Sequence, residues 1–284
     1  MYRRVELFEK PVFVHRAQAM CYAYIFALQN NMETIGIQMT YCNLETEQTK
    51  YFREEFSFEE IKKWFDDLME EYGKWATFQC EMKNQRQASI KELDFPYEYR
   101  PGQKKLVSDV YRTIMRQKLL FMQAPTGVGK TISTIFPAVK AVGEELADRI
   151  FYLTAKTITA TVAKETFALL EKNGYRAKTI QITAKEKLCP CDEMECNPVT
   201  CPYAKGHFDR VNDAVFDLLH RCEMIERDDI LSQADRYTVC PFELCLDTAS
   251  WCDNVICDYN YVFDPNVYLK RFFRKDKGRL YFSH

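Results

Sequence analysis

The sequence lacks the features that would place a protein in or across a membrane. No apolar run in its 284 residues reaches the roughly 18 that a membrane-spanning helix requires. The first ten residues, MYRRVELFEK, have no apolar core of the kind that a signal peptide carries. Internal repeats and low-complexity tracts are also missing. These absences favour a soluble, cytoplasmic protein with no membrane partner, and a hydrophobic content of 47% is enough to build a core.

The sequence also lacks a large excess of charge of either sign. Its formal net charge is −2, so binding to nucleic acid would have to come from a local patch. One such patch is the segment 269–279, which holds six basic residues against one acidic residue. This segment is either a phosphate-contacting patch or a solvated linker, and the linker is the simpler interpretation.

Cysteine, by contrast, is abundant and unevenly placed. Of the twelve cysteines, only Cys21, Cys42 and Cys80 precede residue 189, and nine lie between 189 and 257. Such a cluster in a cytoplasmic protein indicates ligation of a metal or a cluster before it indicates disulfides. Several members are expected to be small buried apolar residues instead. These are Cys222, Cys245, Cys252 and Cys257.

The first part of the chain predicts a small α+β unit. Residues 11–31 have helical periodicity, 34–43 form a strand, and 49–56 form its hairpin partner. Ser57 then opens a long helix, and Glu60 completes a capping box. We expect the apolar stripe of this helix to be packed in a core. The stripe comprises Ile61, Trp64, Phe65, Leu68, Tyr72, Trp75, Phe78 and Met82.

The polar stretch 85–100 predicts a domain boundary, which divides the chain into domains 1–90 and 91–284. After it, segments with strand and helix character alternate, which predicts an α/β fold with a parallel sheet covered on both faces. The predicted strands are 118–123, 149–154, 178–183 and 254–257, and the predicted helices are 130–143, 157–172 and 207–222.

A phosphate-binding loop follows the first of these strands and opens the next helix. Gly127 and Gly129 would let the backbone approach oxygen closely, and the helix N-terminus adds partial positive charge. Lys130 should reach the β- and γ-phosphates, and the Thr131 hydroxyl should hold Mg²⁺, which makes these two the candidate catalytic residues. The alternative is an ordinary strand–helix turn. The nucleotide-binding residues are predicted to be Ala124, Pro125, Thr126, Gly127, Val128, Gly129, Lys130 and Thr131.

Ala124 stands where the strict phosphate-loop pattern has its first glycine. The form Ala-Pro-Thr-Gly-x-Gly-Lys-Thr resembles the variant of superfamily-2 helicases. Upstream, Tyr99-Arg-Pro-Gly-Gln103 resembles their Q-motif, in which a glutamine recognises adenine, so Gln103 joins the candidate nucleotide site. Residues 151–157 resemble motif Ia, which contacts single-stranded DNA in those helicases.

Four cysteines, Cys189, Cys196, Cys201 and Cys240, are the candidate metal ligands. Their spacing suits either Zn²⁺ or an iron–sulfur cluster, and Cys191 competes with Cys189 for the first place. Their sequence context resembles the XPD/DinG family of superfamily-2 iron–sulfur DNA helicases. The matching elements are Leu188-Cys189, Cys196, Cys201-Pro-Tyr-Ala and Cys240-Pro-Phe-Glu-Leu.

The resemblance implies a RecA-like domain with a cysteine-rich iron–sulfur insertion at about 185–245. It further implies ATP, Mg²⁺ and a 4Fe–4S cluster as cofactors, and 5′→3′ unwinding of single-stranded or forked DNA in DNA repair. In that family the cluster is structural and lies beside the DNA path. No obligate protein partner is implied.

The N-terminal segment carries a second, partial resemblance. Gln18-x₃-Tyr22 on a helix, followed by a hairpin and a long helix, resembles the back half of a RecB-like PD-(D/E)xK nuclease. The carboxylates that hold the nuclease metal belong to earlier strands, and no such strands precede residue 11. We therefore expect a nuclease-like remnant without nuclease activity. The alternative is a helical packing module with a chance Gln-x₃-Tyr.

A phosphate-loop ATPase also needs a second acidic motif, which is Asp-Glu-x-His in superfamily 2. The nearest candidate is Asp258-Tyr-Asn-Tyr261, which lacks the glutamate and instead resembles the family's element just upstream of that box. We therefore expect an N-terminal portion of the helicase, without the acidic box and the second motor domain. Such a chain would bind ATP and hydrolyse little of it. The alternatives are a non-catalytic nucleotide- or DNA-binding fragment and a zinc-binding phosphate-loop protein.

Overall fold

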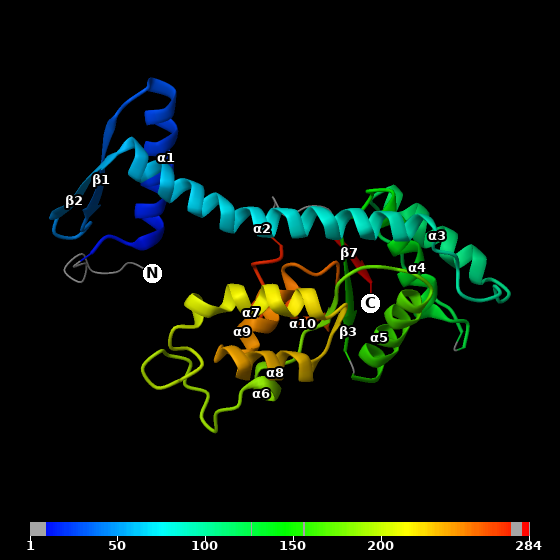
Figure 1. The fold of residues 1–284 in the computed structure, drawn as a ribbon. Coiled ribbons are helices and arrows are strands. Elements are labelled where there is room, and N and C mark those ends of the chain that lie inside the picture. The colour runs from blue at the N-terminus through cyan, green and yellow to red at the C-terminus, as the bar shows by residue number, and fades with distance from the viewer. Residues whose placement is uncertain (1–9, 126, 156, 274–279, 284) are drawn as a thin grey trace. The chain divides into compact units, whose positions relative to one another are not determined.

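A computed structural model of the chain contains two compact units, Met1–Gln79 and Cys80–His284, which are described separately (Figure 1). The division lies inside one long helix, α2 (Phe58–Lys91), so each unit holds part of it. The boundary expected near residue 90 remains a prediction. The structure describes all residues except 1–9, 126, 156, 274–279 and 284.

The first unit is a helix packed on a hairpin. Helix α1 (Phe13–Asn30) precedes strands β1 (Thr34–Cys42) and β2 (Thr49–Ser57), which pair antiparallel from Thr34 opposite Ser57 to Cys42 opposite Thr49. These elements lie where the sequence predicted them. Their shared core comprises Met20, Ala23, Ile37, Met39 and Ile61.

The capping box at the start of α2 is confirmed. The Ser57 amide donates to the Glu60 carboxylate at 2.9 Å, and the Glu60 amide donates to the Ser57 hydroxyl at 3.3 Å. The predicted burial of the apolar stripe is confirmed only in part. Ile61 and Phe78 are buried, whereas Leu68 is 40% and Tyr72 is 62% exposed. Helix α2 has 34 residues and is longer than the nine-residue strands of the hairpin, so the hairpin cannot cover the whole stripe.

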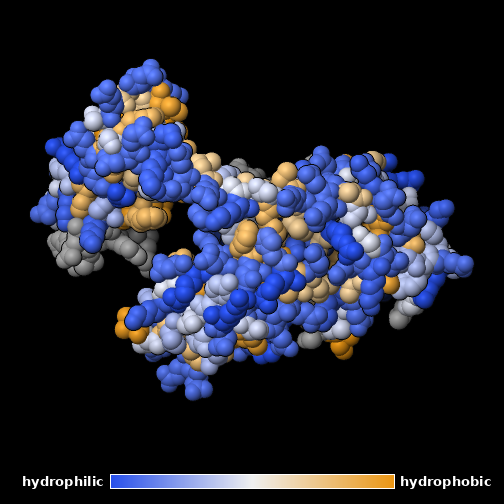
Figure 2. Space-filling model, viewed as in Figure 1, coloured by the Kyte–Doolittle hydropathy of each residue, from blue (hydrophilic) through white to orange (hydrophobic). Residues whose placement is uncertain are grey.

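Apolar side chains also remain exposed on α1. Phe13, Val14, Tyr22 and Phe26 are each more than half exposed. Figure 2 shows orange, hydrophobic residues at the surface of this part of the molecule. No helix in the described part of the chain has the length and apolar character needed to cross a membrane.

The second unit is built on a five-stranded sheet with the order β5-β4-β6-β3-β7. Every neighbouring pair is parallel, as the alternation of strands and helices predicted. This mixed α/β arrangement fits a RecA-like domain. The strands are β3 (Arg149–Thr154), β4 (Thr179–Gln181), β5 (Met224–Ile225), β6 (Asn254–Asp258) and β7 (Leu280–Ser283).

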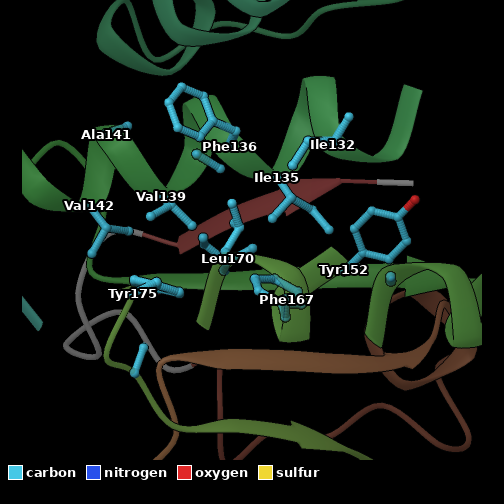
Figure 3. Packing of buried hydrophobic residues seen from close by; sticks show 14 of the residues in the cluster. Ile132, Ile135, Phe136, Val139, Ala141, Val142, Tyr152, Phe167, Leu170 and Tyr175 are labelled. Carbon is cyan, nitrogen blue, oxygen red and sulfur yellow. The ribbon is translucent and has the colours of Figure 1, made fainter. Parts of the chain in front are cut away.

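One face of the sheet is covered by helices α4 (Lys130–Gly143) and α5 (Thr157–Lys172), whose bounds match the prediction. Alternate residues of a strand point to opposite faces, so Ile150 and Tyr152 join Ile135 and Phe167 in this core (Figure 3). Phe151, between them, packs on the other face against Phe272, Phe273 and Phe282. Helix α3 (Gln103–Met115) packs against α4.

The cysteine-rich insertion contains short helices and loops. Helices α7, α8 and α9 pack against one another, and α6 contacts α9. Helix α10 follows β6 directly. The bounds are α6 (Lys185–Leu188), α7 (His207–Arg221), α8 (Arg227–Tyr237), α9 (Pro241–Ala249) and α10 (Asn260–Phe263).

The predicted strand 118–123 is wrong. These residues have no regular structure, and Leu119 and Phe121 are 88% and 93% exposed. A cavity of about 850 Å³ separates the run from β7, and its lining includes Leu119, Phe121 and Tyr281. A strand needs a neighbour for its backbone groups, and no described strand pairs with this segment. The apolar composition of residues 118–123 predicted a strand, but it does not show whether a partner strand is available.

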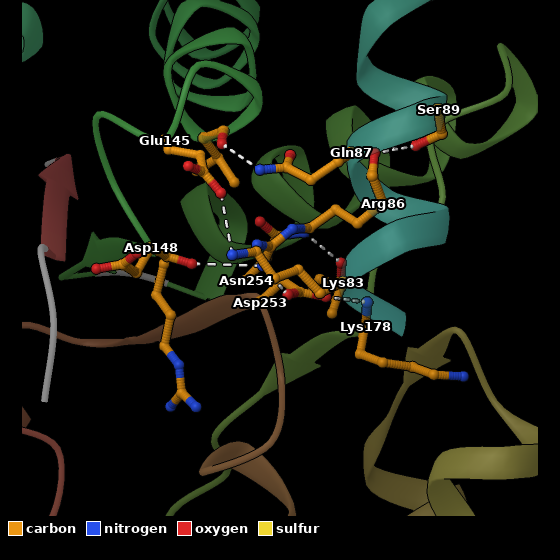
Figure 4. Close-up of polar contacts among 12 residues, drawn as sticks. Lys83, Arg86, Gln87, Ser89, Glu145, Asp148, Lys178, Asp253 and Asn254 are labelled. Carbon is orange, nitrogen blue, oxygen red and sulfur yellow. Dashed lines mark hydrogen bonds and ion pairs between the residues drawn. The ribbon is translucent and has the colours of Figure 1, made fainter. Parts of the chain in front are cut away.

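The last turns of α2 are attached to the N-terminal edge of the sheet (Figure 4). The Arg86 guanidinium pairs with the Asp253 carboxylate just before β6. The other carboxylate oxygen of Asp253 accepts the Lys178 amide at 2.9 Å, and the Gln87 side chain donates to the Val142 carbonyl at 3.1 Å. These contacts fix α2 residues 80–91 to the second unit.

Candidate functional site

The phosphate-binding loop has the backbone that its two glycines permit. Gly127 and Gly129 have φ values of +86° and +79°, a region that residues with a side chain rarely occupy. Gly129 is the N-cap residue of α4, which begins at Lys130. The free amides and positive dipole of this helix N-terminus therefore face the loop, as an anion site requires.

Lys130 and Thr131 lie at the mouth of this loop. The exposed Lys130 ammonium donates to the Ala124 carbonyl at 3.1 Å, so the lysine bridges the two ends of the loop. The half-buried Thr131 hydroxyl hydrogen-bonds the Tyr152 hydroxyl on β3, and burial raises the pKa of Tyr152. Pro125 and Val128 belong to the same loop, and Thr126 lies outside the described residues.

The segment that resembles a Q-motif contacts the loop directly. The Gln103 side-chain oxygen accepts the Arg100 amide at 3.0 Å, and the Arg100 guanidinium donates to the Gly127 carbonyl. The Gln103 amide nitrogen packs on Gly129 so closely that a Cβ built there would lie 2.6 Å from it. Gln103 is only 3% exposed. In this conformation Gln103 braces the loop, and recognition of adenine by it stays a prediction.

The carboxyl ends of β3 and β6 meet at one edge of the sheet. The Tyr259 amide donates to the Thr154 carbonyl at 3.2 Å, which joins the end of β3, within the motif Ia-like segment, to the turn after β6. The Asp258 carboxylate accepts the Asn260 amide at 2.8 Å. This contact engages Asp258 in the turn after β6, and its assignment to the element upstream of the acidic box stays a prediction.

The structure places three of the candidate cysteines near one lysine. The Lys185 ammonium hydrogen-bonds the Cys196 sulfur and lies near Cys240 and Cys189, and these interactions raise the pKa of Lys185. Burial and the adjacent thiols of Cys201 and Cys189 raise the pKa of Cys191 to about 11. All five thiols therefore lie in one neighbourhood.

Cysteine thiols beside a cation suit a thiophilic metal or an iron–sulfur cluster in the kind of donor. In the geometry of the described residues, however, no group of three or more His, Cys, Asp or Glu side chains is close enough to hold a metal ion. Burial raises the pKa of Cys240, so its ionised form needs a cation nearby. The donors fit such a group in their chemistry, and the assignment of a metal or cluster to them stays a prediction.

Three of the remaining cysteines are buried, as predicted. Burial raises the pKa of Cys245 to about 11 and that of Cys257 to about 12, and it also raises the pKa of Cys252. Cys222 is half-buried. Protonated thiols in apolar surroundings act as small core residues.

In the first unit, Gln18 and Tyr22 are exposed on α1. No metal-binding group of acidic side chains lies among the described residues there. In the basic segment, Arg271 pairs with Glu243 at 2.8 Å and with Asp247 at 2.7 Å on α9. Arg271 is therefore part of a folded contact and is not a free phosphate ligand.

Sequence reasoning missed three residues of these sites. Arg100 was within the quoted Q-motif segment, but its contact with Gly127 spans 27 residues of chain. Lys185 stands four residues before Cys189, a spacing that could have indicated it. Tyr152 had no signal beyond being an aromatic residue of a buried strand.

The comparisons with known proteins cover part of the chain. Residues 163–274 match the DEAD_2 family model, a stretch that contains all nine clustered cysteines and excludes the phosphate loop. No curated protein matches the chain significantly.

A solved structure described as XPD_Helicase aligns with a TM-score of 0.43 at 16% sequence identity. The alignment covers 64% of this chain and 31% of that structure, so the chain spans about a third of its length. The DEAD_2 match supports a relationship to a helicase family.

Proposed function

We propose that this chain is an ATP- and DNA-binding part of a 5′→3′ DNA helicase of the XPD/DinG type. The observation that carries the proposal is the phosphate loop, with Gly127 and Gly129 in left-handed conformations at the N-terminus of α4. The parallel sheet and the DEAD_2 match over residues 163–274 also support it.

In the proposed site, the triphosphate enters the loop and displaces the Lys130 ammonium from the Ala124 carbonyl. Lys130 would then pair with the β- and γ-phosphates, while Thr131 exchanges its contact with Tyr152 for Mg²⁺. Arg100 holds the loop through its contact with the Gly127 carbonyl, and Gln103 accepts the Arg100 amide. Gln103 would recognise adenine through its side-chain amide, which requires that side chain to move from its buried position.

The cysteine site is proposed to hold a 4Fe–4S cluster through Cys189, Cys196, Cys201 and Cys240. When bound, the cluster would cross-link four segments of the insertion and stabilise their fold. Lys185 would offset part of the negative charge of the thiolates. The DNA partner is proposed to be single-stranded or forked, held by stacking and backbone contacts near this insertion.

The printed sequence contains no Asp-Glu-x-His box to hold Mg²⁺ and orient water. We therefore expect this chain alone to bind nucleotide and to turn over very little of it. Unwinding would require that motif and a second motor domain. The first unit is proposed to be a nuclease-like remnant that has no metal site and no nuclease activity.

A fluorescent-nucleotide titration tests the proposal. Mant-ATP with Mg²⁺ should bind the wild type weakly, and Lys130→Ala should weaken binding by about tenfold or more, or ~1.4 kcal/mol. The exposed Lys172 at the end of α5 is the matched control, and Lys172→Ala should bind like the wild type. If Lys130→Ala bound mant-ATP as tightly as the wild type, the proposed nucleotide site would be wrong. Brisk DNA-stimulated hydrolysis by this chain would contradict the expected lack of turnover.

The second candidate is a non-catalytic binding protein, and one observation favours it. The segment before the phosphate loop, with Leu119 and Phe121 exposed, lies outside the sheet that would anchor a working motor. A zinc ion in place of the cluster would support this alternative. Metal analysis separates the two, because the helicase proposal requires iron with sulfide and the alternative accepts zinc alone.

A further inference from the structure

His207 joins the two halves of the cysteine constellation. It is the first residue of α7, six positions after Cys201, and its side chain is only 4% exposed. Its ring nitrogen Nδ1 lies 3.2 Å from the backbone nitrogen of Cys240, across 33 residues of chain. A backbone amide only donates, so Nδ1 is the acceptor and the ring proton belongs on Nε2.

The other ring nitrogen faces an anion. Nε2 lies 3.9 Å from the Asp247 carboxylate and has no hydrogen-bond partner among the residues that the structure describes. Asp247 is itself held by Arg271 at 2.7 Å. An N–H directed toward a fixed carboxylate favours the tautomer that leaves Nδ1 free to accept the Cys240 amide.

A second side chain from the same turn of α7 makes a parallel connection. The Arg210 guanidinium donates to the carbonyls of Lys205 at 2.8 Å, Tyr237 at 2.8 Å and Thr238 at 2.6 Å. Lys205 follows Cys201, and Thr238 precedes Cys240. The first turn of α7 therefore fixes the backbone after one candidate ligand and before the other.

The direction of the Cys240 thiol follows from that backbone. Cys240 is the N-cap residue of α9, and its backbone carbonyl accepts the Leu244 amide of the first turn at 2.9 Å. One side of Cys240 is thus fixed by α9 and the other by His207. Rotation of the Cys240 peptide would break the hydrogen bond to Nδ1 and leave a buried amide unpaired.

We propose that His207 is a positioning residue for the cysteine site: its neutral Nδ1 holds the Cys240 peptide so that the Cys240 thiol stays beside Cys196 and Lys185. The proposal rests on the proposed metal-binding role of these cysteines. No direct contact of His207 with the metal group is implied. Because outer residues that orient ligands change metal retention by about 10- to 100-fold, the effect should be measurable without any activity assay.

Two substitutions separate positioning from packing. His207→Asn keeps an acceptor near the place of Nδ1, and His207→Leu removes it. The matched control is Gln233→Leu, because Gln233 is also fully buried and donates to the Ala214 carbonyl of α7 at 2.8 Å without contacting Cys240. His207→Leu loses one buried hydrogen bond. Gln233→Leu loses its bonds to the Ala214 carbonyl and the Asp217 carboxylate and the one it accepts from Arg221, so its thermal stability should fall at least as far.

The first readout is release of iron from the anaerobically purified full chain to a ferrous chelator. The Leu variant of His207 should release iron about tenfold faster than wild type, the Asn variant within about twofold, and Gln233→Leu near the wild-type rate. If the rates of iron release from the two leucine variants simply followed their melting temperatures, His207 would act only in packing, which would overturn the positioning role.

The second readout is the rate at which iodoacetamide alkylates Cys240 in the metal-free chain, followed by mass spectrometry. His207→Leu should raise that rate several-fold relative to Cys189, and His207→Asn should restore it. An unchanged Cys240 rate would overturn the positioning role whether or not the chain binds metal. If the wild type binds no metal but the alkylation rate of Cys240 still depends on His207, the proposed cluster is wrong and the positioning of Cys240 by His207 stands.

Discussion

At the residue scale, the account depends most on Gly129. A side chain there would meet the Gln103 amide nitrogen at 2.6 Å and would also have to adopt a φ of +79°. Gly129→Ala should therefore lower the free energy of unfolding by about 1–2 kcal/mol and weaken mant-ATP binding. Urea denaturation and nucleotide titration measure the two effects.

Gly73 is the control for this substitution. It lies inside α2, and a Cβ there meets nothing within 4 Å. Gly73→Ala should raise stability by about 0.5–1 kcal/mol and leave nucleotide affinity unchanged, because alanine loses less backbone entropy in a helix. Wild-type nucleotide affinity in the Gly129 variant would show that the loop does not need its left-handed backbone.

The choice between Cys189 and Cys191 is also decided at single residues. Cys191 lies near the thiols of Cys189 and Cys201. The proposal gives the first ligand place to Cys189, and a thiolate is the ligating form. Cys189→Ser should abolish bound iron, whereas Cys191→Ser should keep it; the reverse pattern of iron content would exchange the two assignments.

At the scale of elements, the contact of Arg86 with Asp253 attaches the end of α2 to the sheet. Both side chains are largely buried, at 11% and 16% exposure. Arg86→Met removes one partner and leaves the Asp253 carboxylate buried, which should cost about 3 kcal/mol in urea denaturation.

The exposed pair of Lys63 and Asp67 provides the comparison, with exposures of 76% and 64%. Lys63→Met should leave the unfolding midpoint where it is, because exposed pairs contribute little. An Arg86 variant as stable as the Lys63 variant would mean that α2 is not anchored through this pair.

The pair of Arg16 on α1 with Glu54 on β2 predicts a pH dependence. Their shortest contact is 2.7 Å, and the hydrogen bond from Arg16 lowers the pKa of Glu54 below its ordinary 4.5. A lowered acid pKa contributes stability that is complete above the ordinary value and is lost as the pH falls through the lowered one.

Arg16→Met should therefore cost about 1 kcal/mol near neutral pH and progressively less as the pH falls below 4.5. Calorimetric unfolding at about pH 7 and about pH 3 measures the difference. A cost that stays the same at both pH values would assign the effect to the packing of Arg16 on Phe56 instead.

Several elements could be predicted from the sequence because local signals define them. Strand β3 and helices α4 and α5 have the predicted bounds, and the Ser57–Glu60 capping box marks the start of α2. The failures depend on partners far along the chain. Strand β7 forms only by pairing with β3, and the apolar run at Leu119 has no described strand beside it.

The candidate sites divide in the same way. The left-handed glycines and the helix that begins at Lys130 could be predicted, because the spacing of glycine and lysine carries the signal, whereas the roles of these residues and of the five candidate cysteines stay predictions. The contact of Gln103 with Gly129 and that of His207 with Cys240 were not, because they cross 26 and 33 residues of chain. Whether two distant side chains meet depends on packing, which one sequence does not state.

At the scale of the whole molecule, the second unit combines a nucleotide loop and a cysteine constellation on one parallel sheet. The loop lies at the N-terminus of α4, and the constellation is connected to the sheet through α6 and α9. A general phosphate-loop protein needs only the first. The helicase proposal needs both, so the cysteine site is the more discriminating of the two.

The most direct test is therefore the metal content of the anaerobically purified wild-type chain. The account predicts brown protein with about four iron atoms and as much acid-labile sulfide per chain, lost together in Cys240→Ser. A colourless protein without iron, or one that holds zinc alone, would contradict it.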